Sequence, residues 1–258
     1  MPKQTIQNRK RQKIVVLVEK QPKQAGLAFV MHGLSGFKEQ PHIKTFAEAF
    51  RDNGYTVVRF DTTNTFGESY GNYENATTTN YYEDLEDVIS WAATQTWYQE
   101  PFCLTGHSLG GYCTARYAEQ YPEKVKAIAP ISAVISGALT VETGKLRPGL
   151  FEEWERTGWK VEPHVSRPGT FKRIKWSHME DRMTHDLLPK VGTLTMPVLI
   201  IVGELDTSTL PEHQKLLYDK LSGSKEFHVI KNAPHTFRDP EQLSEIKKIM
   251  DAWIKRLK

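Results

Sequence analysis

Two serines of the chain stand between glycines in the pattern G-x-S-x-G, which can present a serine hydroxyl as a nucleophile. They are Ser69 in GESYG and Ser108 in GHSLG. A chain of this length matches the pattern by chance in roughly one protein out of ten, so the flanking elements must distinguish the two serines. The chemistry requires a buried strand directly before the serine and a helix directly after it, because the hydroxyl is exposed only at the sharp turn between them.

Ser108 has both flanking elements and Ser69 has neither. Ser108 follows the apolar run PFCLT and precedes LGGYCTARYAEQY, which has the pattern of a helix. Ser69 lies in the polar stretch DTTNTFGESYGNYENATTTN, which predicts a loop. We therefore predict that Ser108 is the nucleophile and that Ser69 is either a turn serine or a loop residue near the mouth of the site.

A serine nucleophile needs a base, and the base needs an acid that orients it. His235 lies in KNAPHTF, a predicted turn between the strand-like run EFHVI and the last predicted helix. Asp206 comes directly after the apolar run PVLIIV, at the carboxyl end of a strand, where open α/β sheets place their sites. Glu204 is the alternative acid. The chain order Ser108, Asp206, His235 is the order expected for a nucleophile on a strand–turn–helix.

Two backbone N–H groups are expected to hold the oxyanion that develops on the substrate. One belongs to Leu109, at the start of the helix after the nucleophile. The other belongs to Leu34 in the HGLSG loop, where Gly33 permits a close approach of the backbone. We expect His32 and His107 to support the site, His32 by orienting this loop. The alternative role for His32 is that of the base.

Short apolar or β-branched runs alternate with helical patterns along the chain. These runs are residues 13–18, 26–31, 55–60, 101–105, 126–131, 197–202 and 226–230. Most of them lack polar alternation, as strands buried on both faces do. The pattern predicts a doubly wound, mostly parallel α/β sheet. We expect Asn80 to cap one helix, and Asp239 with Pro240 to begin the last one.

One interval is far longer than a crossover helix requires, because about sixty residues separate Ile131 from Pro197. We predict an inserted cap at residues 134–190 and an α/β core formed by residues 1–133 and 191–258. The insertion contains a set of aromatic and methionine side chains that either form a small core of its own or line the underside of a lid over a ligand pocket. The set is Trp154, Trp159, Trp176, Phe151, Phe171, Met179 and Met183.

The composition, 39% hydrophobic and 25% charged over 258 residues, is that of an ordered globular protein and excludes disorder for most of the chain. No apolar run approaches the ~20 residues that span a bilayer, and no apolar segment follows the charged N-terminus. Cys103 and Cys113 stand in apolar surroundings, as buried thiols of a reducing compartment do. We expect a soluble, cytoplasmic protein with no membrane span.

Basic residues are concentrated in the first 24 positions, where Glu19 is the single acid. The rest of the chain therefore carries a formal charge of −3, against +3 for the whole. The run NRKRQK could bind nucleic acid or an anionic membrane surface. It leads at once into a strand-like run without interleaved aromatics, so we expect a solvated hairpin and no nucleic-acid partner.

The motifs HGLSG, GHSLGG, GELD and APHTF resemble those of the α/β-hydrolase superfamily over nearly the whole chain. Within it, they are similar to those of the capped carboxylesterases, a group that includes cinnamoyl (feruloyl) esterases and monoacylglycerol lipases. The resemblance implies a triad of Ser108, Asp206 and His235, oxyanion amides at Leu34 and Leu109, and a cap over the acyl pocket.

The chain departs from this family pattern at one loop. After the run VVRFD, such relatives usually carry a G-H-G-x-S turn, whereas this chain has NTFGES. Only Gly67 and Ser69 fit that turn. The loop lies near the predicted site, so the departure bears on substrate specificity.

The expected function is that of a serine carboxylesterase. It would cleave small-molecule esters of small to medium acyl or aromatic acids through an acyl-enzyme, with no cofactor and no metal. A serine aminopeptidase of the same superfamily is one alternative, and a non-catalytic ligand-binding homologue is the other. The aminopeptidase would bind the free amine of its substrate through acids of the insertion: Glu152, Glu153, Glu155, Glu180 and Asp181. The sequence does not predict an oligomeric state.

Overall fold

An eight-stranded sheet forms the centre of the molecule in a computed structural model, which describes residues 3–144, 148–163 and 169–257. The strand order is β1-β2-β4-β3-β5-β6-β9-β10. The strands are β1 (Lys3–Gln7), β2 (Lys13–Glu19), β3 (Gly26–Met31), β4 (Tyr55–Asp61), β5 (Phe102–His107), β6 (Val125–Ile131), β9 (Val198–Gly203) and β10 (Lys225–Ile230). β2 pairs antiparallel with β1 and β4, and every other pair is parallel. The predicted, mostly parallel sheet is confirmed.

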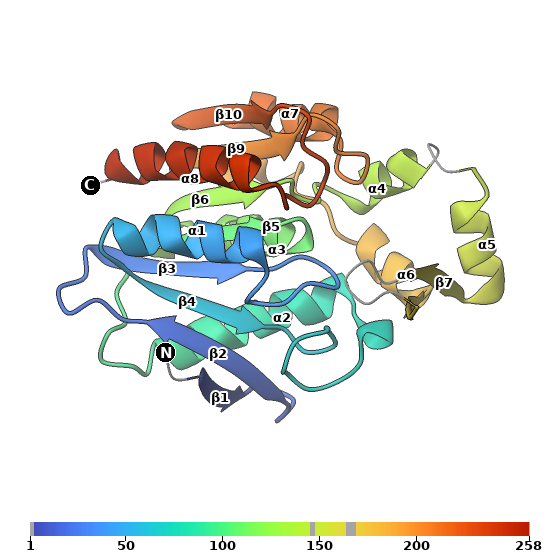
Figure 1. The fold of residues 1–258 in the computed structure, drawn as a ribbon, viewed down its shortest axis with the longest axis horizontal. Coiled ribbons are helices and arrows are strands. Elements are labelled where there is room, and N and C mark those ends of the chain that lie inside the picture. Colours follow the sequence, from blue (N-terminus) through green and yellow to red (C-terminus); the bar gives the residue numbers. More distant parts are fainter. Residues whose placement is uncertain (1–2, 145–147, 164–168, 258) are drawn as a thin grey trace.

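Helices cover both faces of the sheet (Figure 1), which explains why all residues of the central strands β3, β4, β5 and β9 are buried. One face packs against α1 (Pro41–Asp52) and α8 (Pro240–Lys255). The other packs against α2 (Thr78–Ala92), α3 (Leu109–Gln120) and α7 (Pro211–Lys220). Short 3₁₀ turns, η1 (Tyr73–Asn75) and η2 (Pro122–Lys124), complete the connections. In the described ranges, no helix is both long and apolar enough to cross a membrane.

The starts of two helices test the predicted caps. Asp239 caps α8 as expected, because its side chain accepts a hydrogen bond from the Glu241 N–H at 2.8 Å. The prediction for Asn80 is wrong: α2 begins earlier, and the Thr77 hydroxyl accepts from the Asn80 N–H at 3.0 Å. The Asn80 amide instead donates to the Thr63 hydroxyl at 2.6 Å, a tertiary contact that the local sequence does not reveal.

The long interval between β6 and β9 forms a separate layer beyond the carboxyl ends of the parallel strands (Figure 1). It contains α4 (Gly137–Gly144), α5 (Leu150–Thr157), the hairpin β7 (Trp159–Pro163) and β8 (Phe171–Lys175), and α6 (Ser177–Met183), followed by η3 (Val191–Thr193). The chain enters and leaves this insertion side by side, since Gly137 N–H donates to the His185 carbonyl. Residues 145–147 and 164–168 of the predicted cap lie outside the described residues.

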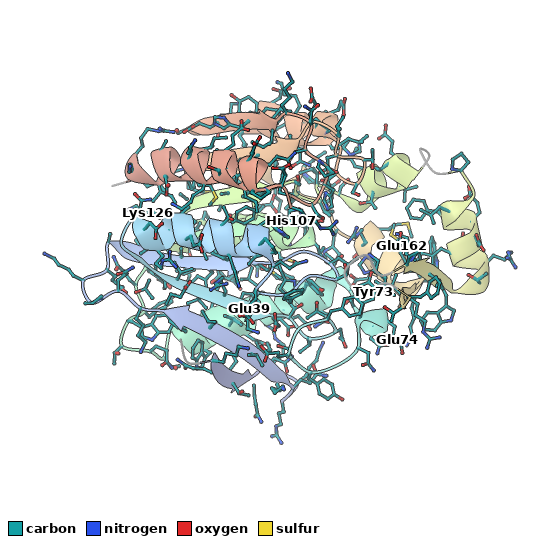
Figure 2. The ribbon with its side chains drawn as sticks, in the orientation of Figure 1. Glu39, Tyr73, Glu74, His107, Lys126 and Glu162 are labelled. Atoms are coloured by element: carbon teal, nitrogen blue, oxygen red, sulfur yellow. The ribbon has the colours of Figure 1, made fainter. Side chains whose placement is uncertain are left out.

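The insertion rests on the core through η1. The guanidinium Nε of Arg173 in β8 lies 3.0 Å from a carboxylate oxygen of Glu74. Lys175, two residues on, donates to the Asn75 side chain at 2.6 Å. Figure 2 shows Tyr73 and Glu74 of η1 beside Glu162 of the insertion. These contacts place the insertion over the edge of the sheet at which the parallel strands end.

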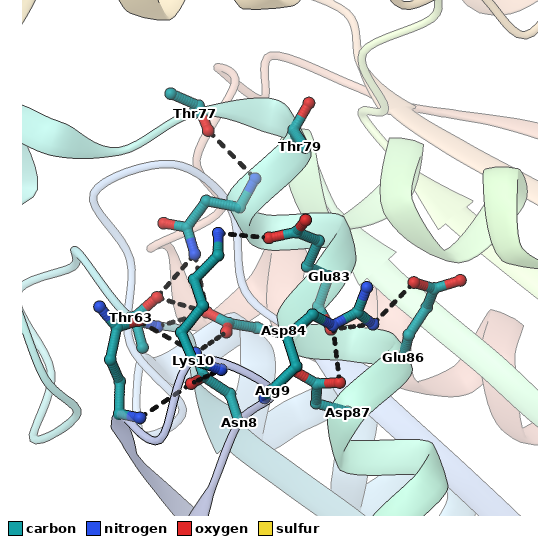
Figure 3. A network of polar contacts seen from close by, with 12 residues as sticks. Asn8, Arg9, Lys10, Thr63, Thr77, Thr79, Glu83, Asp84, Glu86 and Asp87 are labelled. Carbon is teal, nitrogen blue, oxygen red and sulfur yellow. Dashed lines mark hydrogen bonds and ion pairs between the residues drawn. The ribbon is translucent and has the colours of Figure 1, made fainter.

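The basic N-terminal segment forms the expected hairpin, β1–β2, but its turn is not simply solvated. Arg9 donates from its backbone and its Nε to the Asp87 carboxylate at 2.8 and 2.9 Å, and from Nη2 to Glu86 at 2.9 Å. Lys10 pairs with Glu83 at 2.6 Å (Figure 3). These three acids follow one side of α2, so the helix pairs with two of the basic residues of the segment, Arg9 and Lys10.

Candidate active site

Ser108 occupies a sharp turn between β5 and α3. Its φ of 55° and ψ of −117° are rare for a residue with a side chain, and such strain is held in place by the packing around it. A Cβ on Gly106 would lie 2.3 Å from the Gly110 carbonyl oxygen, and one on Gly110 would lie 2.4 Å from the His32 carbonyl oxygen. The two glycines of GHSLG are therefore required by close backbone contacts at the turn.

The structure brings Ser108, His235 and Asp206 together in one hydrogen-bonded chain. His235, in the loop between β10 and α8, has its Nε2 3.0 Å from the Ser108 Oγ. Its Nδ1 lies 2.8 Å from an Asp206 carboxylate oxygen. Because an ionised carboxylate only accepts, Nδ1 carries the hydrogen and Nε2 is left to accept the serine proton.

The Asp206 carboxylate is buried, with 2% of the residue exposed, yet it is fully hydrogen-bonded. Its second oxygen accepts from the N–H groups of Ser208 and Thr209 at 2.8 and 2.9 Å. Burial alone would raise the pKa of this group, but the hydrogen bond and charge of His235, with those N–H groups, lower the pKa to about 2. Asp206 is therefore an anion at any pH near neutrality.

The HGLSG loop lies against Ser108. A Cβ on Gly33 would lie 3.0 Å from the Ser108 Cβ, so the backbone approaches closely there. His32 Nε2 accepts from the Thr62 N–H at 3.1 Å, and its Nδ1 donates to the Gly33 carbonyl at 2.8 Å. Burial lowers the pKa of His32, which keeps the ring neutral in this arrangement. The ring is thus fixed from both sides and cannot serve as a mobile base.

The two amides predicted to face the oxyanion lie next to Ser108. Leu109 is the first residue of α3, where helix N–H groups have no acceptor within the helix. Leu34 lines the same cavity as Ser108 and follows the closely packed Gly33. Their placement is compatible with an oxyanion hole, and their role remains a prediction.

Two residues considered from the sequence lie elsewhere. Glu204, the alternative acid, is exposed and accepts a hydrogen bond from the Asn232 N–H at 2.8 Å. Ser69 Oγ accepts from the Val15 N–H at 2.9 Å and donates to the Asp61 carbonyl at 2.6 Å. Ser69 is absent from the described residues that line the cavity, so its expected place at the site mouth is corrected. It ties its loop to β2 and β4.

A cavity of about 500 Å³ extends from Ser108 and His235 to the insertion. Of the insertion's aromatic set, Phe151 and Trp154 line it, together with Met179. Trp154 also packs against Trp176, with ring centroids 5.6 Å apart. These side chains form both a small core and part of the cavity wall.

Other members of the aromatic set face outward. Trp159 lies under the Arg173 guanidinium at 4.5 Å, on the outside of the β7–β8 hairpin. Phe171 and Met183 are exposed. On β7 and β8, Trp159 and Phe171 alternate with Lys160 and Lys172, which line the cavity, because successive strand residues point to opposite faces.

Sequence reasoning missed the charged part of the cavity wall. This part contains Lys160, Glu162, Lys172 and Arg182. Figure 2 shows Glu162 in the insertion, with His107 at the sheet. The alternation in WKVEP was the available signal, because it places Lys160 and Glu162 on one strand face. Arg182 lies in a seven-residue helix, too short for a periodic signal.

Known proteins share this fold and sequence pattern. A family model described as "Serine aminopeptidase, S33" matches residues 22–241. The chain belongs to this family of α/β hydrolases. A curated relative, the uncharacterized 31.7 kDa protein in the traX–finO intergenic region of Escherichia coli, is 28% identical over 240 residues, covering 81% of this chain and 82% of that protein.

Solved structures agree with the family assignment. The alpha/beta hydrolase domain-containing protein 10 from mouse is 20% identical and superposes with a TM-score of 0.82 over 100% of both chains. Est1E from Butyrivibrio proteoclasticus, solved with ferulic acid bound, is 18% identical, with a TM-score of 0.78 over 98% of both chains. At these identities the likeness confirms the α/β-hydrolase fold, and the family makes the chain a hydrolase.

Proposed function

We propose that this hydrolase is a serine carboxylesterase that cleaves esters of small to medium acyl or aromatic acids. The observation that carries the proposal is the hydrogen-bonded chain from Ser108 through His235 to Asp206, which opens on a cavity large enough for a small molecule. In this proposal residues 134–190 are a cap that closes the cavity and limits the access of water.

The geometry supports a two-step reaction. Ser108 Oγ attacks the ester carbonyl while its proton passes to His235 Nε2, and Asp206 stabilises the imidazolium. The Leu34 and Leu109 N–H groups bind the oxyanion of the tetrahedral intermediate. The intermediate collapses, and the departing alcohol takes the proton from Nε2. Water then attacks the acyl-enzyme with His235 as base, which releases the acid and restores the Ser108 hydroxyl.

The aminopeptidase alternative requires an unpaired acid in the cavity to bind a free amine. None of the acids considered from the sequence is among the described residues lining the cavity: Glu152, Glu153, Glu155, Glu180 and Asp181. Glu162 does line the cavity, but it pairs with Lys160 at 2.8 Å and with Lys172 at 3.4 Å. The surroundings of the cavity therefore favour an ester over an aminoacyl substrate.

A cytoplasmic location is part of the proposal. Cys103 in β5 and Cys113 in α3 are buried free thiols. Burial raises the pKa of both thiols above the ordinary value, which keeps them protonated and unreactive. Buried free thiols are typical of proteins in a reducing compartment.

Turnover of a panel of p-nitrophenyl esters, compared with aminoacyl p-nitroanilides, tests the proposal. We expect the esters to be cleaved, a fluorophosphonate probe to label Ser108, and Ser108→Ala to lower kcat by more than about 1000-fold. Ser69→Ala is the matched control and should retain activity. Faster cleavage of the anilides would favour the aminopeptidase. Failure of the probe to react would favour the non-catalytic homologue.

A further inference from the structure

Arg182, on α6, is the most unusual charged residue of the cavity wall. It lines the cavity although only 8% of the residue is exposed. Within the described part of the chain, its Nε and Nη2 are buried and have no hydrogen-bond partner. Burial lowers the pKa of Arg182 to about 10, so the guanidinium remains charged at neutral pH. A buried cation without a partner destabilises a fold, which makes a ligand the natural counter-ion.

Among the residues that the structure describes, no acid near Arg182 is free to serve that purpose. The neighbouring Asp181 accepts hydrogen bonds from the backbone and hydroxyl of Thr79, at 3.0 and 2.6 Å. Glu162 pairs with Lys160 and Lys172. The two segments of the insertion outside the described residues, 145–147 and 164–168, contain no Asp or Glu.

The whole insertion end of the cavity is positively charged. Of the described residues that line this end, three are cations, Lys160, Lys172 and Arg182, and one is a carboxylate, Glu162. His178, which also lines this end, is neutral because burial lowers its pKa well below the ordinary value. The excess of positive charge therefore does not depend on Arg182 alone, and it lies in the same cavity as Ser108.

We propose that Arg182 binds a carboxylate at the end of the substrate remote from the scissile bond, so that the hydrolase prefers esters that carry a carboxylate. The proposal rests on the proposed esterase function, because it describes the substrate of the same site. A guanidinium binds a carboxylate with charge-assisted hydrogen bonds. Lys160 and Lys172 add to the attraction.

Matched substrates test the proposal and locate the carboxylate. Monoethyl suberate and ethyl octanoate differ by a carboxylate on the acyl side. 7-Carboxyheptyl acetate and octyl acetate differ by one on the alcohol side. We expect kcat/KM for one of the two anionic esters, measured by titration of the released acid, to exceed that of its neutral partner by about 10- to 100-fold. The preferred pair shows on which side of the ester the carboxylate lies.

Variants of two arginines in the insertion test whether Arg182 causes the preference for anionic esters. Arg182→Met should lower the ratio of anionic to neutral kcat/KM by about 10- to 100-fold, and Arg182→Lys should keep part of it. Arg156→Met removes an exposed arginine of α5 that is not among the described cavity residues, and it should leave the ratio unchanged. Equal turnover of anionic and neutral esters by the wild type would overturn the proposal, as would an equal effect of Arg156→Met.

Binding of suberate itself gives a readout that needs no turnover. Suberate should raise the Tm of the wild type and slow fluorophosphonate labelling of Ser108, and Arg182→Met should abolish both effects. If Arg182→Met does not fold, the effects of suberate are measured on Arg182→Lys instead. Suberate and octanoate are also compared as competitors of labelling and turnover in the wild type. Labelled Ser108 and cleaved esters without a response to suberate would refute the carboxylate site alone. An unlabelled Ser108 and uncleaved esters would refute the proposed function.

Discussion

His107 Nε2 lies 2.8 Å from the carbonyl oxygen of His235. Because a carbonyl only accepts, Nε2 carries the hydrogen, and burial lowers the pKa of His107 to about 3, which keeps the ring neutral. The two rings are also close, with centroids 4.8 Å apart. The residue before the candidate nucleophile thus holds the backbone of the loop that carries the candidate base.

Replacing His107 tests this positioning role. His107→Phe keeps the ring volume but removes the donor, so we expect kcat to fall by about 10-fold with little change in KM. His107→Gln retains an N–H donor and should recover most of the activity. Steady-state kinetics on a neutral ester would show the difference. Equal losses in the two variants would mean that the hydrogen bond has no part in placing His235.

Asp206→Asn should lower kcat by about 10³- to 10⁴-fold, because an amide no longer fixes the His235 tautomer that accepts the serine proton. The matched control is Glu204→Gln, which changes an exposed acid two residues away and should leave kcat unchanged. Circular dichroism establishes that both variants are folded. A larger loss for Glu204→Gln would reverse the assignment of the acid.

Ser69→Ala should reduce stability without changing kcat or KM. The hydroxyl joins the Val15 N–H to the Asp61 carbonyl, and loss of both bonds should cost about 1–3 kcal/mol, or roughly 2–12 °C in Tm. Thermal unfolding and ester kinetics on the same preparation test the two halves of this prediction. A changed KM with an unchanged Tm would indicate that Ser69 belongs to the substrate site.

Glu119→Gln should stabilise the protein at pH 8 and have little effect near pH 4.5. Burial raises the pKa of Glu119 to about 7, from an ordinary value of 4.5, and its Oε1 is buried without a partner in the described part of the chain. The native state therefore holds this proton more tightly than the unfolded state. Stability falls as pH rises from about 4.5 to about 7, and the full cost is present above that range.

Thermal unfolding at both pH values measures this effect. Glutamine cannot ionise, so the variant avoids the cost, and we expect a Tm gain of several degrees at pH 8, about 2–4 °C for each kcal/mol. Arg116→Gln is the companion variant. It removes the cation 3.1 Å from Glu119 and should lower Tm further at pH 8 than at pH 4.5. The same Tm offset for Glu119→Gln at both pH values would contradict the raised pKa.

The choice between two glycine-flanked serines could be made from the sequence because its requirements are local. A strand, a tight turn and a helix follow each other within a few residues around Ser108, and the close contacts of Gly106 and Gly110 are what the motif encodes. Asp206 and His235 could be placed by chain order, since the carboxyl ends of parallel strands meet at one edge of the sheet.

The sequence did not reveal contacts between distant segments. The acids of α2 that pair with Arg9 and Lys10 lie more than 70 positions away. Thr77 caps α2, and the Asn80 side chain instead donates to Thr63, on the loop after β4. Such contacts depend on how the elements pack, and no local pattern specifies them.

The sequence by itself thus determined the sheet, the turn at Ser108 and the residues able to join it. Only the tertiary structure decided which side chains line the cavity next to Ser108. The insertion folds back over the sheet edge, so Arg182 enters the same cavity as Ser108 from 74 residues away. Within the described part of the chain, its Nε and Nη2 have no hydrogen-bond partner. This feature, which points to an acidic substrate, is a property of packed neighbours and of burial, which exist only once the chain has folded.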